Sequence, residues 1–231
     1  YCYENGPPRS HPSEPSPSDF RPISVVPILS RIIEKIIVRT HLYPILQDPL
    51  SAHRFADQFA FRPTGSTTAT ILLILQHITT LLAENNPYVT LISLDFSKAF
   101  DSVRHSSLLE KIASLPVPDN IFNWINSYLE SRTHSTLFQN DISSPKSISA
   151  SIVQGSGIGP FSFLITASDL SPILPSNKLF KFADDMYLIV PFNNRSFIES
   201  ELKHIASWAE SNNLKLNHSE TPRFYLKKST K

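Results

Sequence analysis

Apolar residues repeat along much of the chain at the spacing of an α-helix. Between residues 23 and 46, isoleucines and leucines recur at i, i+3 and i+4 with charged residues between them, which predicts an amphipathic helix. Residues 66–86 follow the same period, and Ser66 or Thr67 would cap their first turn. Further helices are predicted at residues 107–115, 118–131, 159–170 and 194–213. Residues 107–115 would begin with a capping box formed by Ser107 and Glu110.

Runs of β-branched and apolar residues predict strands between these helices. Residues 88–95 are apolar at successive positions, which is typical of a strand buried on both faces. Residues 134–153 and residues 178–190 each predict a β-hairpin, and short strands are expected at 214–217 and 223–226. The order of these elements indicates an α+β fold in which helices cover one antiparallel sheet.

The composition limits the classes of protein to which the chain can belong. Its 231 residues are 41% hydrophobic, enough for one large core or two smaller lobes. Residues 1–19 are rich in proline and are expected to form an extended arm. No run of about 18 apolar residues is present, so no membrane span is expected. No signal peptide is recognised, and the missing initiator Met suggests a fragment or a processed piece.

Cysteine, histidine and charge exclude further kinds of site. Cys2 is the single cysteine, which excludes an intrachain disulfide and a cysteine-based zinc site. The eight histidines show no pair with the spacing of metal ligands. The net charge is +1, so any nucleic-acid partner must be inferred from local sites and not from the overall charge.

Three aspartates lie where a structural role is hard to assign. Asp184 and Asp185 interrupt the apolar hairpin at 178–190, where burial of an unpaired charge would cost several kcal/mol. Asp95 ends the first predicted strand, and Asp101, directly before a helical segment, is the better helix cap. Asp95 is therefore left without a simple structural role.

A magnesium site would explain these carboxylates. If the strand that ends at Asp95 neighbours the hairpin in one sheet, Asp95 and Asp184 meet at one edge. Carboxylates within about 4 Å repel each other unless a cation neutralises them. Mg²⁺ takes hard oxygen ligands and keeps positions for phosphates, and two such ions can clamp both oxygens of a phosphoryl displacement. The alternative is that the aspartates lie in a solvated turn.

Three of the five glycines fall in the segment QGSGIGP, residues 154–160. This segment can be a simple loop before a helix at Pro160. Alternatively, Gly155, Gly157 and Gly159 let another chain or a base pair approach the backbone closely. The spacing does not fit a P-loop, because no Lys-Ser/Thr pair follows.

Several of these segments together resemble a known family. LDFSKAFDSV, QGSGIGP with the following FLI, and FADDMYLI occur in the order of motifs A, B and C of reverse transcriptases. DFRPISVVPILSRIIEKII and QFAFRPTGSTTATI resemble the fingers motifs of the same family, and WAESNNLKLN resembles its motif D. The resemblance is strongest to the non-LTR (LINE-type) retrotransposon enzymes and covers residues 18–226.

This resemblance implies a right-hand polymerase that extends a DNA primer on an RNA template with deoxynucleoside triphosphates. Residues 20–90 would form the fingers, and residues 91–231 the palm, with fingers-side helices and a hairpin at 104–153. The thumb would be missing from this chain. The missing thumb and an endonuclease domain would belong to a larger polyprotein that acts in the nucleus.

The resemblance also implies which residues act. Asp95, Asp184 and Asp185 would be catalytic and hold two Mg²⁺ ions, with Mn²⁺ as an alternative. The triphosphate would be lined by the backbone N–H groups of Phe96, Ser97, Lys98 and Ala99.

Further nucleotide contacts follow by motif matching. Phe100 would exclude a ribose 2′-OH, with core packing as its alternative role. Gln154 and Gly155 would support the primer–template and the incoming nucleotide. Arg62 would lie near the triphosphate or the template, because a guanidinium suits phosphate binding, or else it is a surface arginine.

Departures from the family pattern leave a second hypothesis open. Glu220 stands where motif D usually has a Lys, and a carboxylate there would repel phosphates. Gly65 stands where the fingers loop often carries a basic residue. The chain can therefore be a truncated or decayed copy that keeps the fold without polymerase activity. A two-metal phosphatase or nuclease is a third alternative, which leaves residues 154–160 unexplained.

Overall fold

The computed structural model describes residues 2–3, 21–22, 24–63, 65–84, 86–138, 140–217 and 221–228. The proline-rich arm predicted at 1–19 lies outside these residues except for Cys2 and Tyr3, and Glu220 also lies outside them. The α-helices are α1 (Ile28–Ile37), α2 (Thr67–Ala83), α3 (Ala99–Ser102), α4 (His105–Ala113), α5 (Asp119–Leu129), α6 (Gly159–Thr166) and α7 (Ile198–Ser211). A π-helical turn (Val38–Leu42) and 3₁₀ turns (Tyr43–Leu46, Ala52–Phe55, Phe192–Phe197) continue or join them.

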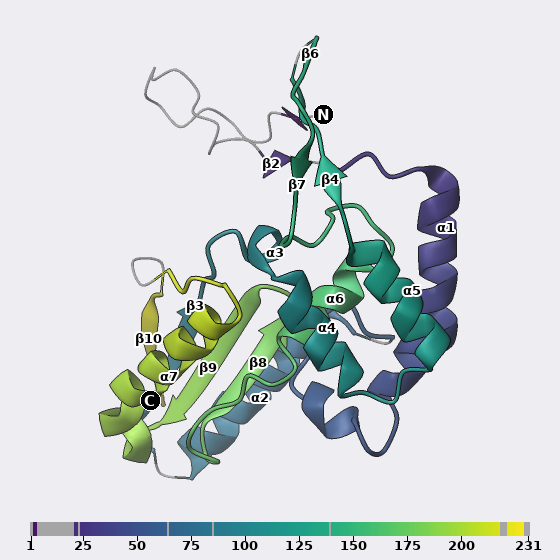
Figure 1. The fold of residues 1–231 in the computed structure, drawn as a ribbon. Helices are drawn as coiled ribbons and strands as arrows, with labels where there is room; N and C mark the ends of the chain where they lie inside the picture. The colour runs from purple at the N-terminus through teal and green to yellow at the C-terminus, as the bar shows by residue number, and fades with distance from the viewer. Residues whose placement is uncertain are drawn as a thin grey trace.

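The main sheet has four antiparallel strands in the order β10-β3-β9-β8 (Figure 1). Its members are β3 (Tyr88–Leu94), β8 (Lys178–Phe182), β9 (Asp185–Pro191) and β10 (Arg223–Lys227). Three short pairs complete the strands, β1 (Cys2–Tyr3) with β2 (Arg21–Pro22), β4 (Thr133–His134) with β7 (Lys146–Ser147), and β5 (Leu137–Phe138) with β6 (Asp141–Ile142). The predicted α+β class and both predicted hairpins are confirmed. The boundaries of fingers and palm stay a prediction.

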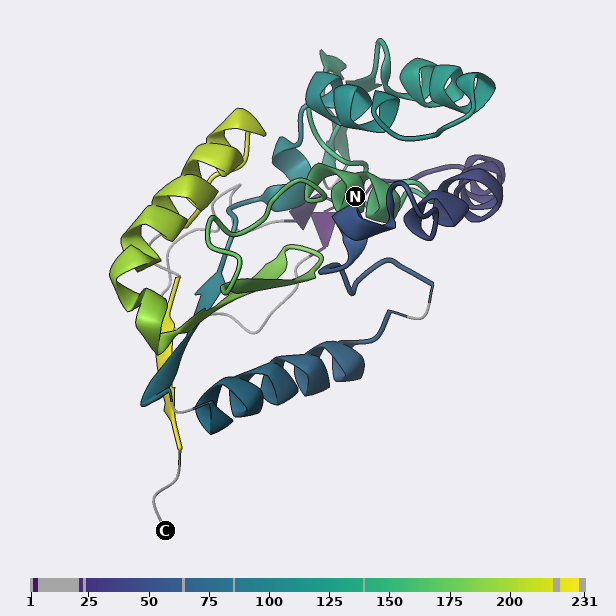
Figure 2. The same ribbon diagram turned by 90° about the horizontal axis from the view of Figure 1, so that it is seen from below.

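Helices cover both faces of this sheet (Figure 2). On one face, α2 packs through Ile74, Ile78 and Leu81 against Val89 and Ile189 of the central strands. On the other face, α7 packs on a larger core that includes even-numbered residues of β3 and β9. The period-2 alternation of a strand places successive side chains on opposite faces. The central strands are therefore buried on both sides, as their apolar sequences predict.

The larger core continues away from the sheet into α4, α5 and α6. Helix α6 is apolar all round and all of its residues but Pro160 are buried, which agrees with the predicted buried helix. The paired strands β4–β7 and β5–β6 form a narrow hairpin that projects from this part of the molecule (Figure 1). No helix among the described residues is both long and apolar enough to cross a bilayer.

Two local predictions fail for physical reasons. Ser107 lies inside α4, which begins at His105 after Arg104, so the predicted capping box is wrong. Arg104 forms a β-bridge with Ala150 directly before the helix. The helix therefore begins at His105, two residues before the predicted start at Ser107. By contrast, Ser66 does cap α2, because its Oγ accepts a hydrogen bond from Ala69 N.

Helix α1 forms where its amphipathic pattern predicts. However, its apolar side chains face solvent, and a charged side chain faces the interior. The large apolar side chains Ile28, Leu29, Ile32, Ile33 and Ile36 are 48–76% exposed. The one α1 residue that is fully buried carries a carboxylate. The contacts of that residue, Glu34, are described below.

Candidate active site

The register of the sheet brings two of the three candidate carboxylates together. Leu94, the last residue of β3, is the Cα partner of Met186 in β9. One residue further towards the same edge are Asp95 and Asp185, and the negative charge of Asp95 contributes to the raised pKa of Asp185. Strand pairing therefore brings the segments of motifs A and C to one edge of the sheet. The meeting of Asp95 with Asp184 around a metal ion stays a prediction.

Asp184 lies at the turn that joins β8 to β9. Phe182 pairs with Asp185, so the loop between them contains only Ala183 and Asp184. Ala183 has φ of 57°, in the left-handed region that two-residue hairpin loops favour. Asp184 and Asp185 are exposed in this turn. The turn interpretation and the metal-ligand interpretation of the sequence are thus compatible.

The electrostatics of this edge are unfavourable without a neutralising charge. The pKa of Asp185 is raised, first by partial burial and then by the negative charges of Asp184 and Asp95. Asp95 is half-buried, and its Oδ2 accepts a hydrogen bond from Asn217 Nδ2 at 3.2 Å. Asp95 O also accepts from Asn217 N at 2.9 Å. Asn217 therefore fixes the backbone and the carboxylate of Asp95 together.

The donor chemistry of the edge fits a divalent cation. Three carboxylates supply only hard oxygen donors, which Mg²⁺ and Mn²⁺ prefer. Over the part of the chain that the structure describes, no three His, Cys, Asp or Glu side chains are gathered closely enough to form a set of metal ligands.

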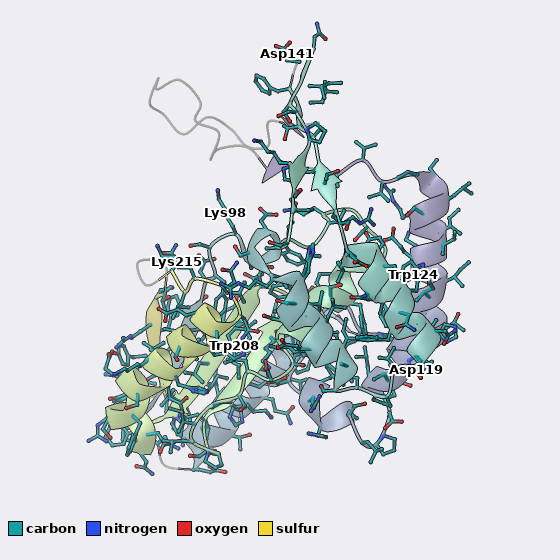
Figure 3. The ribbon with its side chains drawn as sticks, viewed as in Figure 1. Lys98, Asp119, Trp124, Asp141, Trp208 and Lys215 are labelled. Carbon is teal, nitrogen blue, oxygen red and sulfur yellow. The ribbon has the colours of Figure 1, made fainter. Side chains whose placement is uncertain are left out.

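The residues that follow Asp95 lead away from the sheet into a tight turn. Phe96 is buried against Trp208, with ring centroids 6.0 Å apart, so its side chain belongs to the core. Ser97 N donates to Lys215 O at 2.9 Å. This N–H, one of the four that were predicted to line the triphosphate, is therefore already hydrogen-bonded within the chain. Lys98 adopts φ of 49° and is exposed, and Figure 3 shows its side chain directed away from the body of the molecule.

Phe100 is half-buried between two other aromatic rings. Its ring stacks on Phe163 with centroids 4.5 Å apart and meets Phe61 edge-on at 6.3 Å. Phe163 belongs to α6, and Phe61 belongs to the segment that precedes α2. Both contacts hold the ring in a defined position, so a steric role and a packing role remain compatible.

Gln154 and Gly155 lie in the loop before α6 and contact two other segments. Gln154 Nε2 donates to Asp101 Oδ1 at 2.8 Å, and Gln154 O accepts from Ser24 N at 3.3 Å. Gly155 has φ of 96°, and a Cβ there would lie 3.3 Å from Ser24 O. Asp101 lies within α3 and its carboxylate accepts from Gln154, so the prediction that it caps a helix is wrong. The segments of motifs A and B are therefore linked directly.

The other candidate residues make contacts within the chain. Arg62 Nη1 donates to Phe55 O at 2.5 Å and to Gln58 O at 3.1 Å, so its guanidinium folds back on its own loop. The close approach predicted at Gly157 is made by α1 and not by another chain, since a Cβ there would lie 2.8 Å from Glu34 Cβ. The loop before α6 is thus confirmed, and the approach of another chain or a base pair to these glycines stays a prediction.

The sequence analysis missed a buried ion pair that involves the β8–β9 hairpin. Lys181 is fully buried in β8, and its Nζ lies 2.9 Å from Asp57 Oδ2. The same Nζ donates to Ala167 O at 2.8 Å and to Leu170 O at 2.6 Å. Burial is the main cause that lowers the pKa of Lys181, and Asp57 partly opposes it. The signal was present in KLFKF, where a lysine occupies an inward position of an otherwise apolar strand.

The sequence matches the family described as reverse transcriptase (RNA-dependent DNA polymerase) over residues 10–230. One relative is the probable RNA-directed DNA polymerase from transposon BS of Drosophila melanogaster, 30% identical over 93% of this chain and 24% of the relative. Another is the RNA-directed DNA polymerase from mobile element jockey of the same species, 29% identical over 90% of this chain and 24% of the relative. The chain thus spans about a quarter of the length of these relatives.

Solved structures agree on the fold. Apo telomerase from Candida tropicalis, truncated from its C-terminal domain, matches with a TM-score of 0.61 at 18% identity, over 85% of this chain and 43% of that one. Telomerase of the same species in complex with a fragment of telomeric RNA matches with a TM-score of 0.62 at 16% identity, over 86% of this chain and 34% of that one. The solved structures support the fold alone, whereas the family match and the transposon relatives confirm the resemblance to non-LTR retrotransposon enzymes: the chain belongs to the reverse transcriptase family.

Proposed function

We propose that the chain is the fingers and palm module of an RNA-directed DNA polymerase, which adds deoxynucleotides to a primer 3′-OH. The observation that supports this proposal is the pairing of β3 with β9, which brings the segment of Asp95 and the segment of Asp184 and Asp185 to one edge of an antiparallel sheet. The match to the family over residues 10–230 supports a polymerase over a two-metal phosphatase or nuclease.

Asp95, Asp184 and Asp185 would hold two Mg²⁺ ions, or Mn²⁺ in their place. When bound, such ions lower the pKa of the 3′-OH and neutralise charge on the leaving pyrophosphate. The chain's own contribution is to orient these ligands. Asn217 fixes Asp95 through two hydrogen bonds, and the two-residue turn at Ala183 fixes the direction of Asp184.

Neighbouring residues would bind and select the nucleotide. Phe100, held by its stack on Phe163, would exclude a ribose 2′-OH. Gln154 and Gly155 would support the primer–template and the incoming nucleotide, and the backbone N–H groups of residues 96–99 would line the triphosphate. The implied partners are an RNA template, a DNA primer and deoxynucleoside triphosphates, within a larger polyprotein that acts in the nucleus.

A decayed copy is the second candidate, and two contacts favour it. The guanidinium of Arg62 bonds backbone carbonyls of its own loop, and the N–H of Ser97 bonds Lys215 O. Both groups would have to change partners to reach a triphosphate. In such a copy the fold would persist while nucleotide addition is lost.

Primer extension on poly(rA)·oligo(dT) with Mg²⁺ tests the proposal. The Asp184→Asn variant removes one ligand charge, and we expect extension to fall by about 10³-fold, which corresponds to about 4 kcal/mol of transition-state stabilisation. Asp141→Asn is the matched control, because Asp141 is exposed at the projecting hairpin (Figure 3). Extension that survives Asp184→Asn would overturn the metal assignment. No extension by the unmodified chain would favour the decayed copy.

A further inference from the structure

The most unusual side chain outside the three aspartates is the carboxylate of Glu34. Glu34 is fully buried, although it lies in α1, the helix whose apolar residues face outward. Burying an ionised carboxylate costs several kcal/mol unless hydrogen bonds compensate it. The contacts of Glu34 must therefore explain why α1 presents its polar side inward.

These contacts are made with the loop before α6. Glu34 Oε2 accepts from Gly157 N at 2.6 Å and from Ile158 N at 3.3 Å, and Oε1 accepts from Ser30 Oγ at 2.9 Å. The two backbone donors lie at the N-terminus of α6, where the helix dipole favours a negative charge. The carboxylate thus ties α1 to the glycine-rich loop.

The same contact requires glycine at position 157. A Cβ on Gly157 would lie 2.8 Å from Glu34 Cβ, 3.0 Å from Lys35 N and 3.1 Å from Arg31 O. Two of these atoms belong to the helix backbone, which cannot move aside as a flexible side chain can. Gly157 therefore permits the approach that brings the carboxylate within hydrogen-bonding distance.

The other end of this loop contacts the segment of motif A. Gln154, three residues before Gly157, donates to Asp101, and Asp101 follows Asp95 by six residues. The loop is thus held at one end by Glu34 and at the other by the segment that carries a catalytic carboxylate.

We propose that Glu34 is a positioning residue for nucleotide addition, which sets the placement of Gln154 and Gly155 against the incoming nucleotide. This inference rests on the proposed polymerase function. Glu34 touches the loop backbone and would not touch the nucleotide, so it acts through Gln154 and Gly155. A small displacement of a positioning group can lower a rate by about 10²-fold.

The chain supplies a matched control with the same chemistry. Glu201 is also fully buried, and it accepts from Ile173 N at 2.9 Å, Leu174 N at 3.0 Å and Asn177 Nδ2 at 2.7 Å. Asn177 directly precedes β8, at the end of that strand opposite to Asp184. A purely structural carboxylate and a positioning carboxylate can therefore be compared within one molecule.

The experiment compares Glu34→Gln with Glu201→Gln in the unmodified chain. Glutamine keeps the size of the side chain but removes the charge and one acceptor, so both variants should lose similar thermal stability. In primer extension, we expect Glu34→Gln to raise the KM for deoxythymidine triphosphate at least fivefold, and Glu201→Gln to leave it within twofold. Equal changes of KM in both variants would overturn the proposal.

Hydrogen exchange without substrate provides a measurement that is independent of activity. We expect faster amide exchange at residues 155–158 in Glu34→Gln, and faster exchange at residues 173–177 in Glu201→Gln. Unchanged exchange at 155–158 would overturn the positioning role even in an inactive chain. If exchange rises there while the unmodified chain extends no primer, the polymerase proposal fails and the loop contact stands.

Discussion

Charged side chains in the interior are neutralised by protein groups, whereas those at the sheet edge lie close to charges of the same sign. Glu34, Lys181 and Glu201 are fully buried, and protein groups satisfy each of them with three or more contacts. Asp184 and Asp185 are exposed at the end of a hairpin, and the pKa of Asp185 is raised in part by its acidic neighbours.

We expect this difference to distinguish charges that hold the fold together from charges that bind a ligand. A buried ion that the chain itself neutralises fixes how segments pack, and removal of one partner leaves the other uncompensated. The edge carboxylates repel each other and gain most from a cation that comes from outside. Three predictions test this contrast, in order of decreasing effect on the free energy of unfolding, and the first has a matched control.

The largest effect is expected for Lys181→Met. This change leaves Asp57 without its partner and removes the donor to two buried carbonyls, so the free energy of unfolding should fall by about 3–5 kcal/mol. Urea denaturation measures the loss. The double variant with Asp57→Leu should recover part of it, because no charge is then left buried without a partner.

Lys111→Met is the matched control for that variant. Lys111 Nζ contacts Asp169 Oδ1 at 2.6 Å and donates to Thr166 O at 2.6 Å; its own side chain is 17% exposed, and that of Asp169 is 53% exposed. Because Asp169 stays solvated when Lys111 is removed, the loss should be smaller than for Lys181→Met, at about 1–2 kcal/mol. Equal losses for Lys111→Met and Lys181→Met would contradict the distinction between buried and exposed pairs.

The second prediction is that Gly157→Ala costs less stability than Lys181→Met. The added Cβ would press on Glu34 and on the backbone of α1, and overpacking of this kind costs about 1–3 kcal/mol. Thermal denaturation measures the effect. A neutral substitution would mean that α1 can shift without cost, and that the contact with Glu34 does not determine the position of the loop.

The smallest effect, and the one of opposite sign, is expected for Asp185→Asn. The pKa of Asp185 is raised above 3.8 in the folded chain, so the folded state holds this proton more tightly than the unfolded state does. Its contribution to stability is present at low pH and is lost as the pH rises through the folded pKa. At pH 7 the variant should therefore be slightly more stable, by less than about 1 kcal/mol for so exposed a group.

Thermal denaturation from pH 4 to pH 8 checks this prediction. The gap between the variant and the unmodified chain should open as the pH rises above the ordinary aspartate range. Added Mg²⁺ should stabilise the unmodified chain more than the variant, because the variant has lost one ligand charge. A variant that is less stable than the unmodified chain at pH 7 would contradict the repulsion at the edge.

Segments whose local pattern agrees with their environment were predictable from the sequence. Helix α2 begins after Ser66 as its capping residue indicates, and β3 is buried on both faces as its apolar run indicates. The hairpin of β8 and β9 turns at Ala183 and Asp184, inside the predicted ADD segment. In these segments, interactions between near neighbours are enough to decide the structure.

Predictions failed where a distant contact outweighed the local pattern. The start of α4 is moved by the bridge between Arg104 and Ala150, and Asp101 bonds Gln154 where a cap was expected. The apolar pattern of α1 predicts that Glu34 faces solvent, but two backbone N–H groups of the loop before α6 bind it in the interior.

The sequence by itself determined the family, the order of the elements and the identity of the three candidate aspartates. Each of these depends only on local residue patterns and on the order of the motifs along the chain. Only the tertiary structure decided which charges are satisfied within the protein. A hydrogen bond such as that between Glu34 and Gly157 joins residues far apart in the chain, and no local pattern specifies it. The same long-range pairing of β3 with β9 brings Asp95 to Asp185.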